Sequence, residues 1–194
     1  MLEHDNDIND TNAPPGYGAV AKSFHWLVAL FMIGDFLLGM SMVDLPLSPQ
    51  KLRWYSYHKW LGVTVFWLAT LRIAWRAFHP GPPLPATIPS WRQAAIHCMH
   101  WVLYALMFAI PLSGWLFSAA SGVPVVYLGM LPLPSPVGKD AALAEVFKSS
   151  HLILAYCALV LVLIHIGAAL QHHFTQRDGV LARMLPFVKP GKDS

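Results

Sequence analysis

Four long apolar segments constrain this chain more than any other feature of its sequence. They cover about residues 24–43, 61–78, 96–120 and 151–172. Each is close to the roughly 20 residues that an α-helix needs to cross the hydrocarbon core of a bilayer. A helix satisfies its own backbone polar groups, which lipid cannot do. The sequence therefore predicts an all-α integral membrane protein built as a four-helix bundle.

The composition agrees with a membrane protein. Of the 194 residues, 56% are hydrophobic and only 12% are charged, whereas soluble domains carry about 25% charged residues. The net charge is +3 without a basic stripe, so we expect a lipid bilayer and no nucleic acid as partner. The length suits one domain, placed at residues 17–186 between polar tails at 1–16 and 187–194.

The connections between the segments predict the topology. Residues 79–85 are rich in proline and glycine, which predicts a stiff extended connector. The long connection 121–150 ends in a polar stretch, 139–150, that suits an interfacial helix running into the last segment. With both termini in the cytoplasm, that side carries eight Lys and Arg residues against five outside. Because cytoplasmic loops carry the excess of basic residues, we expect this orientation.

Four histidines fall at two depths of the predicted bundle. His151 and His165 are fourteen positions apart on the last segment, which places them on one helix face about 21 Å apart. His25 begins the first segment at the inner end, and His58 precedes the second at the outer end. Ionisable side chains are rare in hydrocarbon and mark functional sites. Depth pairs His25 with His165, and His58 with His151.

Each pair suits a bis-histidine haem site, in which two neutral imidazoles face each other at one depth. Zinc is disfavoured because structural zinc gathers four ligands at one point, whereas these four lie at two depths. The chain has no Cys-x-x-Cys-His motif, so the haem would be bound non-covalently. For His25 and His58 taken singly, an interfacial histidine bonded to water remains the alternative.

Other polar residues in or near the membrane leave alternatives open. Arg72, fourteen positions after His58, either neutralises haem propionates or extends to the inner interface. Asp35, near mid-membrane in the first segment, is either a protonated carboxyl bonded to a neighbour or a proton-transfer group. A histidine cluster at the inner boundary either lines a quinone pocket or lies among headgroups; it comprises His97, His100, His172 and His173.

Several short motifs occur in order along the chain. They are SFHWL at 23–27, HKWLG at 58–62, LRIAWR at 71–76, PLSGW at 111–115, LIH at 163–165, HHF at 172–174, RDGVL at 177–181 and RMLP at 183–186. Together with His151, this set resembles the bacterial cytochrome b561 family of four-helix di-haem membrane cytochromes. The resemblance runs from about residue 17 to residue 186 and implies a multi-pass protein of the bacterial inner membrane.

The resemblance implies two haem b groups, an inner one held by His25 and His165 and an outer one held by His58 and His151. It also implies electron exchange with ubiquinone. Bis-histidine iron has no free coordination position, so it transfers single electrons rather than binding oxygen.

The family includes a member that oxidises superoxide at the outer face and passes electrons to quinone inside. Carried over, this makes the chain a candidate superoxide:ubiquinone oxidoreductase, with Ser23 and His173 as candidate inner quinone contacts. An attractive entrance for an anion would be formed by Lys51, Arg53, Lys59 and Lys148.

Two alternatives remain from the sequence. One is a haem b membrane-anchor subunit that passes electrons from a hydrogenase or dehydrogenase to quinone. The other is a haem-free transporter whose histidines line a metal path.

Overall fold

Four long helices make up nearly all of the regular structure. The computed structural model describes residues 16–86, 88–176 and 179–185. In this part of the chain the long helices are α1 (Ala19–Val43), α2 (Pro49–Phe78), α3 (Ser90–Ala120) and α4 (Ala141–Gln171), and a short π-helix, η1 (His172–Gln176), follows α4. All four are long and apolar enough to cross a membrane, which confirms the predicted helical membrane architecture. Of the predicted polar tails, only Gly16 lies within the described residues.

All four helices begin earlier than the apolar segments predict, and side-chain caps explain two of these starts. Ser48 caps α2 by accepting a hydrogen bond from the Lys51 N–H, and Pro49 follows at the first helical position. Asp140 caps α4 by accepting from two backbone N–H groups, so the predicted interfacial helix is the start of α4. Capping side chains favour helix starts whatever the hydropathy of the following turn. As a result His58 and His151 lie inside helices rather than at their ends.

A small β-hairpin, which the sequence does not predict, closes one end of the bundle. This end is called the outer end after the predicted orientation, and the opposite end the inner end. Its strands, β1 (Val126–Tyr127) and β2 (Leu131–Pro132), pair antiparallel. The Trp60 indole N–H donates to the Val126 carbonyl at 2.7 Å, and the Thr64 and Tyr127 hydroxyls are 3.0 Å apart. These tertiary contacts, rather than a local turn motif, tie the hairpin to α2.

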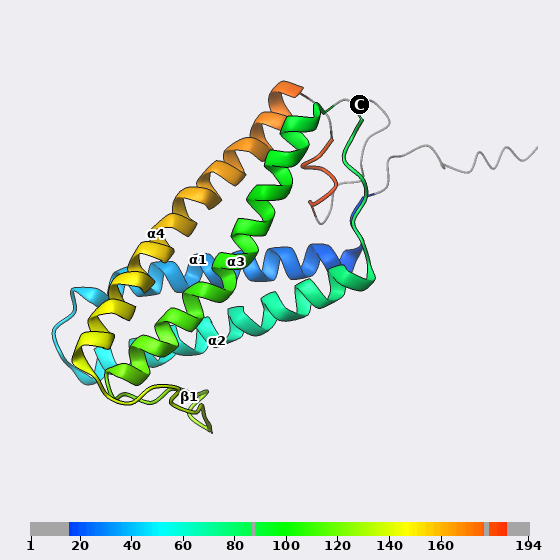
Figure 1. Ribbon diagram of the computed structural model, residues 1–194. Coiled ribbons are helices and arrows are strands. Elements are labelled where there is room, and N and C mark those ends of the chain that lie inside the picture. Colours follow the sequence, from blue (N-terminus) through cyan, green and yellow to red (C-terminus); the bar gives the residue numbers. More distant parts are fainter. Residues whose placement is uncertain (1–15, 87, 177–178, 186–194) are drawn as a thin grey trace, which may run out of the picture.

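Consecutive helices pack on one another. The main helix contacts join α1 with α2, α2 with α3, and α3 with α4. In Figure 1 the α1–α2 pair is inclined to the α3–α4 pair. The segment 179–185 returns to the start of α1, where Trp26 and Lys22 donate to the carbonyls of Met184 and Leu185.

The buried core is small and lies between the helices, close to His25 and Arg72. Val28, Ala69, Tyr104 and Met107 form it, one or two from each of α1, α2 and α3. Many apolar side chains on the outer faces are exposed, for example Leu30 at 67%. An apolar exterior of this kind is expected where lipid, not water, is the solvent.

Overpacking this core should destabilise the protein. Ala69 is fully buried at 0% exposure, so Ala69→Leu must displace its neighbours, at about 1–3 kcal/mol. We expect a lower thermal unfolding midpoint of the purified protein in detergent, measured by circular dichroism. Ala74→Leu, on the same helix but exposed, is the matched control and should melt like the wild type. Equal melting of both variants would contradict the tight packing.

Candidate functional site

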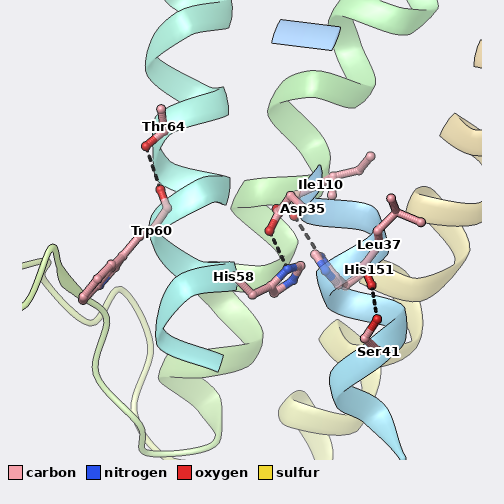
Figure 2. A network of polar contacts seen from close by, with 8 residues as sticks. All are labelled: Asp35, Leu37, Ser41, His58, Trp60, Thr64, Ile110 and His151. Atoms are coloured by element: carbon pink, nitrogen blue, oxygen red, sulfur yellow. Dashed lines mark hydrogen bonds and ion pairs between the residues drawn. The ribbon is translucent and has the colours of Figure 1, made fainter. Parts of the chain in front are cut away.

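The outer histidine pair joins α2 to α4. The ring centroids of His58 and His151 are 5.9 Å apart with an interplanar angle of 84°. Nδ1 of His58 lies 2.7 Å from Oδ1 of Asp35 on α1. Nδ1 of His151 donates to the Ile110 carbonyl on α3 at 3.0 Å. Figure 2 shows both contacts, which bind each ring through Nδ1 and leave its Nε2 as the nitrogen for a ligand.

Two glycines make room for these rings. A Cβ added at Gly39 would lie 3.2 Å from Cε1 of His58, and one at Gly114 would lie 3.0 Å from Cε1 of His151. Both distances are too short for ordinary contact, so larger residues at these positions would push against the imidazoles. The helix backbones can come this close to the rings because glycine has no side chain at these two positions.

The inner pair joins α1 to α4. The ring centroids of His25 and His165 are 6.4 Å apart with an interplanar angle of 58°. Nδ1 of His25 is buried and has no hydrogen-bond partner among the described residues. A buried ring nitrogen without a partner is unusual, and it fits an imidazole that is arranged around a further group.

His100 and Arg72 complete the inner site. The His100 ring packs edge-on against His165 at 5.3 Å, and its Nδ1 donates to the Ile96 carbonyl at 2.7 Å. Sequence reasoning left His100 among the boundary histidines. The apolar segment gave little information on the depth of His100, because α3 begins at Ser90, before that segment. Only the packing of α3 on α4 brings His100 to His165.

Arg72 is half-buried. Its guanidinium carbon lies 5.2 Å above the ring of Tyr104, and its charge acts on the rings of His25 and His165. Arg72 also lines a small cavity of about 30 Å³ together with Arg76. The inner site is therefore cationic.

The remaining predicted residues are dispersed. Ser23 and His173 are both exposed near the inner end, with the His173 ring packed on Phe174 at 4.9 Å. At the outer end Lys51 donates to the carbonyls of Val43 and Leu45, and Lys148 pairs with Glu145 at 3.4 Å. Arg53 is exposed and Lys59 is half-buried.

The spacing within each pair would suit two imidazoles that hold one iron between them. With metal–imidazole bonds of about 2 Å and the half-widths of two rings, such imidazoles would have ring centroids roughly 6 Å apart. In the described part of the chain, no group of three or more His, Cys, Asp or Glu side chains is suited to hold a metal ion.

Membrane-spanning helices that face histidine pairs toward one another define a class of membrane haem protein. The family model described as prokaryotic cytochrome b561 matches residues 16–187. The chain belongs to this family, and the family implies haem b. The facing rings and the glycines beside them fit that cofactor.

Curated relatives cover almost the whole chain. Cytochrome b561 homolog 2 of Escherichia coli is 38% identical over 90% of this chain and 94% of its own length. Cytochrome b561 homolog 1 of the same species is 29% identical over 84% and 92%. A probable superoxide oxidase, CybB, of Yersinia pestis is 28% identical over 88% and 96%.

The contact between Gly114 and His151 gives a test of the site. Gly114→Ala should displace the His151 ring, because its methyl group would lie 3.0 Å from Cε1. We expect less haem per protein and a cost of about 1–3 kcal/mol in stability, measured by the pyridine haemochrome spectrum and thermal unfolding.

Gly34→Ala is the matched control, since a Cβ there meets nothing within 4 Å. Haem content that is the same in both variants would show that Gly114 does not shape the site.

Proposed function

We propose that this protein carries electrons across the bacterial inner membrane through two haem b groups. His25 and His165 hold the inner haem, and His58 and His151 hold the outer one. The observation that carries the proposal is the presence of two separate facing pairs, with ring centroids 6.4 Å and 5.9 Å apart. One pair would hold a single haem, whereas two pairs at different depths would hold two haems and so provide a path for electrons across the membrane.

The spacing along α4 sets the length of that path. His151 and His165 lie on one continuous helix, so fourteen residues separate them by about 21 Å along its axis. Bound haem would supply the one-electron chemistry. The protein residues hold the imidazole orientation, exclude water from between the helices with the core around Tyr104 and Met107, and place charge near each pair.

Both termini lie in the cytoplasm in this proposal, as the basic residues indicate. The inner pair then faces the side on which ubiquinone is reduced or its quinol oxidised. Ser23 lies two positions before His25, and His173 lies just beyond α4, so both are near the inner pair and are proposed quinone contacts. Arg72 is the proposed partner of an inner haem propionate, because its half-buried cation acts on His25.

Superoxide is the proposed electron donor at the outer face. The support is the printed name of one relative, the probable superoxide oxidase of Yersinia pestis, and the basic residues at the outer end. An anion is attracted to such a surface before it reaches the outer pair.

The two-haem arrangement predicts the effect of removing one ligand. His165→Ala should remove one haem of two, because a single imidazole holds the inner iron less well than a pair. The measurement is haem per protein by pyridine haemochrome, with the His97→Ala variant as control, since His97 is exposed on α3.

Unchanged haem stoichiometry in His165→Ala would reject its ligand role. Co-purification of the wild type with a large soluble dehydrogenase would favour the membrane-anchor alternative.

The anion entrance predicts a salt-dependent rate. Changing Lys51, Arg53 and Lys59 together to Gln should slow haem reduction by superoxide about tenfold or more at low ionic strength. The difference in rate between the triple variant and the wild type should shrink at high salt, because salt screens the three cations of the wild type. Stopped-flow absorbance measures the rate. Arg92→Gln, at the other end of the bundle, is the control. A triple variant with the wild-type rate and the wild-type salt dependence would reject the proposed anion entrance.

A further inference from the structure

Asp35 is an acidic side chain placed inside a membrane span. The other acidic residues that the structure describes lie at helix ends or in the first turns of α4, namely Asp44, Asp140 and Glu145. The side chain of Asp35 is 15% exposed. An ionisable group at this depth is costly unless it has a partner and a role.

The partner of Asp35 is the outer-pair residue His58. Oδ1 of Asp35 lies 2.7 Å from Nδ1 of His58, whose side chain is 20% exposed. Glycines on both helices let α1 and α2 pack closely enough for this contact. Gly62 faces Asp35, since its added Cβ would lie 3.8 Å from Oδ2, and Gly39 leaves room for the His58 ring.

The contact fixes the chemistry of the His58 ring. Oδ1 of Asp35 and Nδ1 of His58 are at ion-pair distance, 2.7 Å, without a hydrogen bond between them in the described residues, and this contact at Nδ1 leaves Nε2 as the nitrogen for iron. A carboxylate beside a ligating imidazole favours the proton on the nearer ring nitrogen and raises the basicity of the ring as a ligand. His151 differs, because its Nδ1 donates to a neutral carbonyl of Ile110.

Opposite charges stand beside the two pairs. The charge of Asp35 acts on His151 as well as contacting His58, whereas the charge of Arg72 acts on His25 and His165. Negative charge stabilises ferric iron and positive charge stabilises ferrous iron, so charge and hydrogen bonds to the ligands tune haem potentials. Of the outer cations, Lys51 and Lys148 already have partners, and Arg53 is exposed, so its charge is screened more than a buried one. Lys59, next to His58 in the chain, is half-buried, and its positive charge works against part of the effect of Asp35.

We infer that Asp35 is a positioning residue that makes the outer haem the lower-potential one of the two, an inference that rests on the proposed function. With haem bound, one electron would pass from a ferrous outer iron to a ferric inner iron, so that the outer iron would become ferric and the inner iron ferrous. No proton moves in this step. Electron transfer from an outer donor toward inner quinone would then run from the lower to the higher potential, and the position of Asp35 would set its direction.

Asp35→Asn separates charge from shape. The amide keeps the size and shape of the carboxylate beside the His58 ring, but the negative charge is gone. In the haem-loaded protein, a redox titration followed by absorbance should show a positive shift of the lower midpoint potential only. The higher midpoint and a haem stoichiometry of two should stay unchanged.

Asp44→Asn is the matched control, because it removes the same charge from the residue that ends the same helix. It should leave both midpoints unchanged. Asp35→Leu also removes the polar group beside Nδ1 of His58, so the ring is held less tightly and the low-spin electron paramagnetic resonance signal of the affected haem should broaden. Midpoints of Asp35→Asn equal to those of wild type, or shifted equally for both haems, would overturn the inference.

A second measurement tests the order of potentials even where Asp35→Asn fails to fold. His165→Ala should retain the outer haem, and its single midpoint should match the lower wild-type value. A match to the higher value would overturn the inference while leaving two haems in place. A wild-type protein that holds fewer than two haems would instead contradict the proposed function.

Discussion

The facing imidazole rings between α4 and the α1–α2 pair are the contacts on which the rest of this structure depends. Each helix packs mainly on its neighbour in the sequence, and Ala158 is the buried residue in α4. Helices in lipid gain little from apolar contact alone, so packing and polar contacts decide how they associate. His151 and His165 reach across from α4 to His58 on α2 and His25 on α1.

The surroundings of the two pairs differ in a way that suits one-way electron flow. At the outer pair, Asp35 binds His58 and the Ile110 carbonyl binds His151. At the inner pair, Arg72 supplies positive charge, and His100 packs against His165. Family membership establishes a membrane haem protein, whereas these contacts are particular to the geometry of this chain and supply the proposed direction.

Much of this architecture could be predicted because it depends on local sequence. Apolar length indicates the spans, and a separation of fourteen residues places His151 and His165 on one helix face. The start of α2 was predicted too late, because hydropathy does not register the capping by Ser48. The hairpin at Val126–Tyr127 was missed because its support comes from Trp60, 66 positions away in the sequence.

By itself the sequence determined the membrane setting, the helices and the depth of each histidine, because hydropathy and helical rise act along one segment at a time. Only the tertiary structure decided which neighbour each side chain meets. Asp35 had two open interpretations until α1 packed against α2 and brought its carboxylate to His58. His100 was one of four boundary histidines until α3 packed on α4. Such contacts depend on the rotation of one helix against another, which no single segment encodes.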